Sequence, residues 1–467
     1  MRVVMTVKQA CTEFIWPTYS LILLTILLVT VDCSLSDKRP ISTSSSSRAF
    51  IRQDFRRSKQ NFISRLKRNV HSSRPPVALT YTIDMFGGTY KLQLRQTLVA
   101  SEQLKSVRIT RNGTIVLIPG LYGQSHCHYA GTVTTCQPTT RHCYDGQAAM
   151  SRFAHGLRGV MKIGGEDILI EPLPETLLAK RMRFSNVHIA RRKVTDDIQE
   201  SEKTGIQDLL DKLSSSLDVS GTSLDVRPLS NPPNLLNVEV GVFVDLPMVQ
   251  KLREIYPDEY DQITLILSAY NAVNMLYSNI TIGRIKVRLL VKHVLLDESG
   301  TMPNSEKVTE YLNDLCRRYQ REILKKLKIV KNWDLTTALT GLDVYADAVD
   351  VTRDEAYKNL RGSAKKIFTV SGVSYGGGMC SFEKNCMVAE FSLLFGNIET
   401  IAHEAGHTLG MYHDGSGNTC DRKGNRIMSI QRPQRQRSGW STCSVESLRK
   451  FVVSGHASCL INKHATA

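Results

Sequence analysis

The sequence predicts an α/β fold built around a largely parallel sheet, with a β-rich region before it. Segments rich in β-branched and apolar residues, such as Val238–Asp245 and Ile285–Leu296, alternate with segments whose apolar residues recur at helical spacing. Strands that alternate with helices favour a parallel sheet with crossover helices. Between residues 76 and 175, short stretches of alternating polarity such as 90–94 predict strands instead.

Helical spacing is clearest in two parts of this α/β region, and two further strands are expected at 338–345 and 367–375. The apolar positions that define the two helices are Ile263, Leu267 and Tyr270 in the first and Val308, Leu312, Leu315, Tyr319 and Ile323 in the second.

A third helix is predicted near residue 400. Its apolar stripe, at spacings of four, three and four, consists of Ile398, Ala402, Ala405 and Leu409. Asn397 is placed to cap its amino terminus. His403 and His407 fall off the stripe, so we expect them to face a cleft while the stripe faces the core.

The segment 403–414 reads HEAGHTLGMYHD and places three histidines within reach of one metal ion. His403 and His407 lie one helical turn apart on the same face. Gly410 allows the chain to leave the helix, so that His413 returns as a third ligand. Three protein ligands leave a fourth position for water, which is typical of a catalytic zinc site. Glu404 lies where it can accept a proton from that water.

The pattern HExxHxxGxxHD resembles the signature of the metzincin zinc proteases, and Met428 resembles the methionine of the turn that follows it. Asp414 after the third histidine resembles the reprolysin branch, which comprises adamalysins, ADAM and ADAMTS proteases and snake-venom metalloproteases. The stretch 372–380 resembles that branch's edge strand, and 458–463 resembles the end of its catalytic domain. The resemblance is strong over residues 235–467 and weaker over 75–175.

The resemblance implies a metzincin catalytic domain: a mixed, mostly parallel twisted sheet with an antiparallel edge strand, an active-site helix and a methionine turn. The edge strand would be 373–377, and it would bind an extended peptide by strand addition. The residues implied in substrate binding are Ser374, Tyr375, Gly376 and Gly377. The implied activity is that of a zinc metalloendopeptidase with Glu404 as general base, acting on extracellular proteins.

Two further features follow from the resemblance alone. A structural Ca²⁺ would bind oxygen atoms of Glu239, Asp334, Asn462 and the Cys459 carbonyl. The implied disulfides are Cys316–Cys459, Cys380–Cys386 and Cys420–Cys443, although six cysteines allow fifteen pairings.

Composition shifts divide the chain into five segments. We expect a signal peptide at 1–34, a low-complexity basic linker at 35–75 and a β-rich prodomain at 76–175. A connecting and processing segment at 176–234 then leads to the catalytic domain at 235–467.

A secreted, extracellular and monomeric protein is expected. The apolar run 21–29 fits a signal peptide, with an uncleaved type II anchor as the alternative. The 11 cysteines and the glycosylation sequons at Asn112 and Asn279 agree with an oxidising compartment.

The formal charge of +16 does not indicate a nucleic-acid partner. Residues 231–467 carry 29 Lys+Arg against 25 Asp+Glu, so most of the excess lies in the first 230 residues. No nucleic-acid motif accompanies it.

Latency departs from the family pattern. Many relatives block zinc with a prodomain cysteine, but Ala154 stands at the expected position and no cysteine lies between 173 and 315. A Cys143 switch is one alternative, and a disulfide plus one leftover cysteine among Cys127, Cys136 and Cys143 is the other. A second metal site made of His126, Cys127, His128, His142 and Cys143 is a further alternative.

Processing sites also leave alternatives. The furin-type sequence at 65–68 precedes the prodomain, whereas 180–183 and 191–193 are better placed but poorer matches.

The competing functional class is a non-enzymatic binder on a metzincin scaffold. An intact set of ligands and base argues against it. The sequence ends close to the expected end of the catalytic domain, as in single-domain venom or salivary metalloproteases.

Overall fold

The computed structural model describes most of the chain from residue 76 to 461, together with one earlier strand. The described residues are 48–52, 76–86, 88–118, 127–136, 143–153, 156–172, 187–192, 234–278, 284–328, 331–347, 366–367, 370–393, 395, 397–422, 424–429 and 439–461. Within these ranges, no helix has the length and apolarity needed to cross a membrane. The signal, linker, connecting segment and proposed cleavage sequences lie mostly or wholly outside them.

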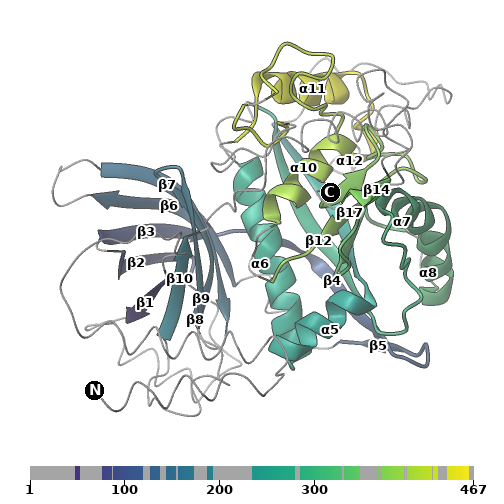
Figure 1. Ribbon diagram of the computed structural model, residues 1–467, viewed down its shortest axis with the longest axis horizontal. Helices are drawn as coiled ribbons and strands as arrows, with labels where there is room; N and C mark the ends of the chain where they lie inside the picture. Colours follow the sequence, from purple (N-terminus) through teal and green to yellow (C-terminus); the bar gives the residue numbers. More distant parts are fainter. Residues whose placement is uncertain are drawn as a thin grey trace, which may run out of the picture. The chain divides into compact units, whose positions relative to one another are not determined.

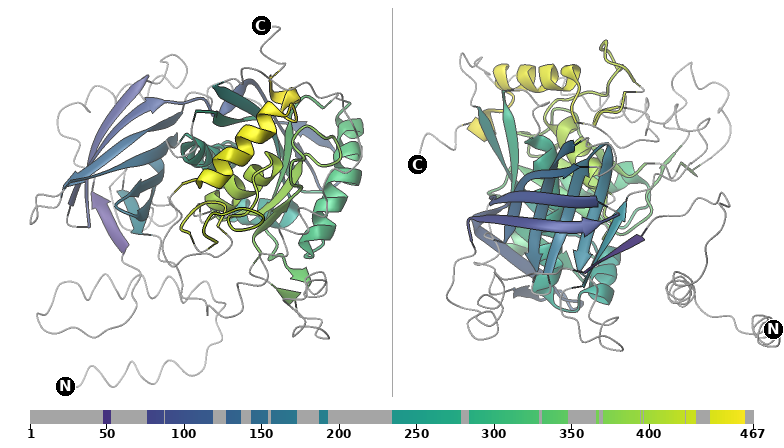
Figure 2. Two further views of the ribbon diagram at one scale, coloured as in Figure 1. Left: turned by 90° about the horizontal axis from the view of Figure 1, so that it is seen from above. Right: turned by 90° about the vertical axis from the view of Figure 1, so that its left-hand side faces the viewer.

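The amino-terminal part forms an eight-stranded antiparallel sheet in the order β1-β10-β9-β8-β7-β6-β3-β2 (Figure 1; Figure 2, right). Its strands are β1 (Arg48–Arg52), β2 (Ala78–Met85), β3 (Gly88–Gln96), β6 (His128–Cys136), β7 (Cys143–Phe153), β8 (Gly156–Ile163), β9 (Glu166–Pro172) and β10 (Val187–Arg192). Alternation along β3 buries Leu92 and Leu94 against Tyr129, Val133 and Met161. The β-rich region expected at 76–175 is therefore present.

A second sheet has seven strands in the order β16-β17-β13-β11-β12-β4-β5. Its strands are β4 (Ala100–Ile109), β5 (Ile115–Leu117), β11 (Leu235–Val244), β12 (Lys286–Asp297), β13 (Leu335–Thr340), β16 (Gly372–Ser374) and β17 (Cys386–Glu390). The five strands from β17 to β4 run parallel, while β16 and β5 pair antiparallel at the two ends. β4 and β5 come from within the predicted prodomain, and no pattern in the sequence indicates that these two strands join the second sheet.

A short two-stranded ribbon, β14 (Ala346–Asp347) with β15 (Lys366–Ile367), lies outside both sheets.

Helices connect and cover the second sheet. They are α5 (Leu246–Ile255), α6 (Glu259–Tyr277), α7 (Val308–Asp314), the π-helical η4 (Leu315–Tyr319), α8 (Gln320–Leu327), α10 (Ile398–Thr408), α11 (Thr442–Val453) and α12 (Ser458–Ile461). Asp245 caps α5 by accepting a hydrogen bond from the Met248 amide at 3.0 Å. Almost all of α6 is buried, because it packs on β12 and α10 and also on β7 (Figure 1).

Two basic residues of β8 contact the segment around the start of α10. The Arg158 side chain is only 2% exposed and lies 3.3 Å from Glu171, and it also donates hydrogen bonds to Leu393 O and Tyr256 Oη. Lys162 Nζ lies 2.7 Å from a carboxylate oxygen of Glu399, in the first turn of α10. A buried charge is retained only where it is paired in this way, so these contacts fix β8 against the beginning of the active-site helix.

Four disulfides are formed among the described residues, and two of the three predicted pairings are wrong. Cys316 pairs with Cys386 and Cys380 with Cys459, with Cα–Cα distances of 5.7 and 5.6 Å, in place of Cys316–Cys459 and Cys380–Cys386. Tertiary packing explains the difference. Cys316 on η4 lies beside Cys386, the first residue of β17. Cys380, in the loop before β17, lies beside Cys459 on α12. The predicted Cys420–Cys443 bond is confirmed.

The fourth disulfide joins Cys136 to Cys143 across the ends of β6 and β7. Cys143 therefore has no thiolate for a zinc-blocking switch, and Cys127 is the leftover cysteine of the described part of that region.

Peptide mapping under non-reducing conditions tests the revised pairing, and should recover Cys316 linked to Cys386 and Cys380 linked to Cys459. Replacing Cys316 and Cys386 together by alanine should lower the free energy of unfolding by about 4 kcal/mol, because the bond joins residues 70 apart. The matched control removes Cys420–Cys443, which joins residues 23 apart and should cost about 3 kcal/mol. Recovery of a Cys316–Cys459 peptide would contradict the pairing.

Candidate metal centre

The helix α10 carries the first two histidines, and its packing is as the sequence predicts. The stripe Ile398, Ala402, Ala405 and Leu409 is buried in the main apolar cluster. Asn397 precedes the helix but makes no side-chain capping bond. At the other end Gly410 adopts a φ of 78°, and the Met411 amide bonds back to Gly406 O at 3.0 Å. Glycine enters this left-handed conformation without strain, and the chain turns back toward the helix.

The three histidines meet at one point. Nε2 of His403 lies 2.8 Å from Nε2 of His413 and 3.1 Å from that of His407, and the His407–His413 distance is 3.1 Å. Each side chain is at most 5% exposed. Within the described ranges, these three residues form the one cluster of metal-ligating side chains with such spacing.

Backbone carbonyls fix two of the rings from behind. His403 Nδ1 lies 2.7 Å from Ile427 O, and His407 Nδ1 lies 2.8 Å from Met411 O. A carbonyl only accepts, so Nδ1 holds the proton and Nε2 presents a lone pair to the shared point. Burial also lowers the pKa of His407 to about 4, which keeps the ring neutral.

Zinc fits this arrangement. Lone pairs that face one another at 2.8–3.1 Å need a cation between them. A tetrahedral ion with zinc–nitrogen bonds of about 2.0–2.1 Å holds its ligand nitrogens about 3.3 Å apart, close to the distances here. The predicted ligand set is thus brought together by the fold.

The segment 427–429 forms the floor below the ligands. Met428 is fully buried, and its sulfur, the Met411 sulfur and the Trp440 ring would each lie 3.2–3.3 Å from a Cβ placed on Gly406. A side chain at Gly406 would therefore require these three neighbours to shift by a few tenths of an ångström. The position of Met428 agrees with a supporting role and not with a ligand role.

Asp414 anchors the floor, as the sequence suggests. Its amide bonds to Met428 O at 2.9 Å, and its carboxylate accepts from Ser441 Oγ at 2.5 Å and Ser429 Oγ at 3.4 Å. The side chain is fully buried, so the carboxylate has a structural task away from the three rings.

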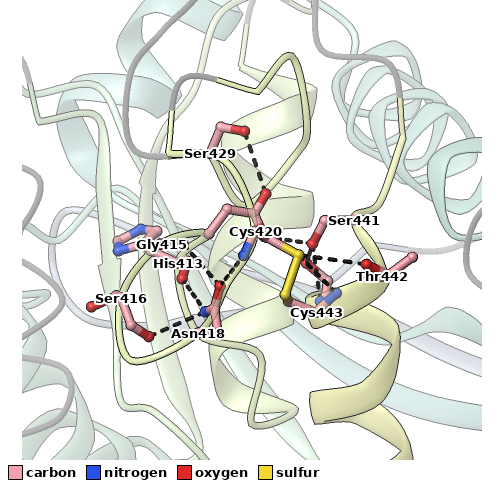
Figure 3. The surroundings of a disulfide bond; sticks show 11 residues. His413, Gly415, Ser416, Asn418, Cys420, Ser429, Ser441, Thr442 and Cys443 are labelled. Atoms are coloured by element: carbon pink, nitrogen blue, oxygen red, sulfur yellow. Dashed lines mark hydrogen bonds between the residues drawn. A yellow bond between two sulfur atoms is a disulfide. The ribbon is translucent and has the colours of Figure 1, made fainter.

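A compact loop then supports His413 (Figure 3). Asn418 Nδ2 donates to His413 O at 2.7 Å, while Asn418 Oδ1 accepts from the amides of Gly415 and Cys420. The Cys420–Cys443 disulfide ties this loop to the start of α11. The third ligand lies outside any helix and depends on these contacts for its position.

The glutamate between the first two histidines lies beside the edge strand. Glu404 is 5% exposed, and its Oε2 accepts a hydrogen bond from Ser374 Oγ at 2.7 Å. Sequence reasoning placed Ser374 among the backbone contacts for substrate and missed this side-chain contact. No signal in the sequence could have found it, because the two residues are thirty positions apart.

The predicted edge strand is shorter than expected. β16 ends at Ser374, and 376–377 form a turn. Tyr375 is buried and donates to Asn313 Oδ1 at 2.7 Å, so its side chain points away from the three rings. The Gly377 amide bonds to His407 O at 2.8 Å.

Two of the predicted calcium ligands are adjacent, but a cation already contacts one of them. The Glu239 amide bonds to Asp334 Oδ2 at 2.8 Å, and Lys292 Nζ lies 2.8 Å from Glu239 Oε1. Cys459 lies at the start of α12, bonded to Cys380, and Asn462 is outside the described residues.

Other predicted positions are resolved in part. The alternative second metal site loses Cys143 to a disulfide, and His128 is buried with Nδ1 2.7 Å from Ser151 Oγ. Burial lowers the pKa of His128 to about 3. Asn112 is exposed in the turn between β4 and β5. Asn279, Ala154, His126 and His142 lie outside the described residues.

Comparison with known proteins agrees with this centre. Residues 325–464 match the model of the reprolysin (M12B) family zinc metalloprotease. The human protein "A disintegrin and metalloproteinase with thrombospondin motifs 6" is 28% identical over 365 residues, which cover 72% of this chain and 30% of that protein. The mouse protein with thrombospondin motifs 18 is 32% identical over 53% of this chain and 18% of its own length, and the bovine protein with thrombospondin motifs 2 is 27% identical over 81% and 30%.

A solved structure, metalloproteinase-II from Bacteroides fragilis, aligns with 84% of this chain and 95% of its own at 10% identity and a TM-score of 0.37. The chain spans less than a third of the length of these three curated relatives. The family match contains all three histidines, Glu404 and Met428. Over residues 325–464, the chain is therefore similar to the reprolysin family of zinc metalloproteases.

Proposed function

We propose that the protein is a secreted zinc-dependent endopeptidase that hydrolyses peptide bonds of extracellular proteins. The observation that carries this proposal is the convergence of three buried imidazoles, whose Nε2 atoms lie within 3.1 Å of one another, next to the buried carboxylate of Glu404 on α10. The match of residues 325–464 to the reprolysin family of zinc metalloproteases supports the same reaction.

The roles of the residues follow from their chemistry. Bound zinc would supply a Lewis acid that polarises the scissile carbonyl and acidifies water. His403, His407 and His413 would hold it. Glu404 would accept the proton of the attacking water and pass it to the leaving amine, so that no covalent enzyme intermediate forms.

Substrate binding is proposed along β16. This strand ends the sheet on the side of α10, so its outer edge carries backbone groups that β17 does not pair. An extended peptide added there would gain backbone hydrogen bonds and lie along the helix that carries the ligands. Ser374, Tyr375, Gly376 and Gly377 would provide those backbone groups.

The amino-terminal sheet is proposed to be a prodomain that is removed on activation. Its contacts through Arg158 and Lys162 reach the start of α10 and not the three histidines. Latency by a Cys143 thiolate is not part of the proposal, because Cys143 is disulfide-bonded.

Replacing Glu404 by alanine tests the reaction. We expect cleavage of casein or gelatin to fall by about 10²–10⁴-fold, because the proton acceptor is lost. Zinc content and melting temperature should match the wild type, since Glu404 is not a ligand. Near-normal cleavage by a zinc-replete Glu404→Ala protein would overturn the proposal, and a binder without protease activity would then be the better interpretation.

Removing a ligand tests the metal. The purified protein should contain one zinc per chain by metal analysis, and a zinc chelator should abolish cleavage until zinc is added back. His413→Ala should lose zinc and activity together, because two protein ligands do not complete the site. His456→Ala changes an exposed histidine in the turn after α11; it is the matched control and should keep both. Full zinc occupancy in His413→Ala would contradict the ligand set.

A structural calcium at Glu239, Asp334, Cys459 and Asn462 is the less supported part of the proposal. Oxygen ligands suit Ca²⁺, but the Lys292 ammonium already contacts Glu239. A rise in melting temperature on adding calcium to the metal-stripped protein, seen by calorimetry, would support the ion. An unchanged melting temperature would indicate that the Lys292 ammonium, and not Ca²⁺, balances the charge of Glu239.

A further inference from the structure

The edge strand and the active-site helix are joined by a row of contacts along one helix face. Ser371 Oγ lies 3.1 Å from Thr400 Oγ1, and the Met379 amide bonds to Thr408 O at 3.1 Å. Between these two contacts lies the one that involves Glu404. The segment 371–379 is therefore held beside the same face of α10 that presents the proposed base.

The glycine of β16 brings the strand unusually close to Glu404. A Cβ built on Gly372 would lie 2.9 Å from Glu404 Cγ and 2.8 Å from Thr400 Cγ2. Such distances are not tolerated between carbon atoms, so only glycine permits this approach. Two residues later, Ser374 points its hydroxyl at the carboxylate of the same glutamate.

The direction of this hydrogen bond follows from the donor inventory. Ser374 Oγ lies 2.7 Å from Glu404 Oε2 and 2.9 Å from Glu404 O, and it has one proton to give. Oε2 is the nearer of these two acceptors, so we assign the Ser374 proton to the Glu404 carboxylate.

We propose that Ser374 is a positioning residue for Glu404. Its hydroxyl fixes the rotation of the carboxylate and holds it ready to receive the proton of the attacking water. This inference rests on the proposed role of Glu404 as general base. Ser374 is only 1% exposed, so bulk water does not compete for the contact.

The placement also connects substrate binding to the base. The backbone of β16 is the proposed docking edge for the peptide, while the Ser374 side chain on that strand contacts Glu404. A peptide that pairs with β16 therefore lies against the same strand whose Ser374 side chain orients the Glu404 carboxylate. Ser374 thus serves both functions: its backbone binds the extended peptide, and its side chain orients Glu404.

The test compares three variants, prepared from the protein secreted by cells that express the full chain. Ser374→Ala should lower kcat about tenfold and leave KM within about twofold, because the lost contact serves the reaction and not the binding of substrate. Ser374→Thr keeps the hydroxyl and should restore most of kcat. Ser371→Ala removes the neighbouring strand-to-helix contact and should leave kcat unchanged.

A second readout does not depend on turnover. A peptide hydroxamate binds zinc proteases through the metal and shares a proton with the neighbouring carboxylate. Its affinity should fall in Ser374→Ala, while zinc content and melting temperature stay at wild-type values. In a Glu404→Ala background, the Ser374→Ala change should have no further effect on that affinity, because the group it acts through is absent.

Wild-type kcat and hydroxamate affinity in Ser374→Ala would overturn the inference. Equal losses in Ser374→Ala and Ser371→Ala would also overturn it, since they would assign the effect to strand packing. Activity retained by Glu404→Ala would defeat the proposed function itself. Loss in Glu404→Ala combined with a normal Ser374→Ala protein would defeat the positioning role alone.

Discussion

To bind one zinc ion, three imidazole nitrogens must stay within about a bond length of it, and the surrounding contacts hold them close enough together to do so. His403 and His407 keep their spacing because α10 is locked by a buried apolar stripe. His413 has no helix to hold it, so the turn at Gly410, the Asn418 loop and the 420–443 disulfide hold it instead. Backbone carbonyls accept hydrogen bonds from Nδ1 of His403 and His407 and so set the tautomers of these two rings.

The parts of this centre that could be predicted are those encoded at short range. The spacing of the three histidines, the stripe of α10 and the turn at Gly410 all lie within about four helical turns of sequence, where helix geometry dictates which side chains share a face. Met428 and Asp414 were identified by their resemblance to the family signature, and the structure joins them through the bond from the Asp414 amide to Met428 O.

The rest depends on long-range packing. Which of Cys380 and Cys386 faces Cys316 is set by where η4 meets β17, and sequence spacing carries no such information. The Ser374–Glu404 and Lys292–Glu239 contacts join residues that are 30 and 53 positions apart. Alternating polarity predicted the β-rich amino-terminal region. It could not show that β4 and β5 of this region pair within the second sheet and not within the first.

The pairing of β4 and β5 with the second sheet affects what removal of the amino-terminal region would expose. β4 pairs with β12 from Val291 to Asp297, so residues 100–109 protect the outer edge of the catalytic sheet. Cleavage between 176 and 234 that released residues 76–175 would also withdraw β4 and β5. β12 would then present a row of bare amide and carbonyl groups, and such an edge is a template for pairing with another chain. The sheet would then have two free edges: the outer edge of β16, which is already free beside the three histidines, and the newly exposed edge of β12 on the opposite side.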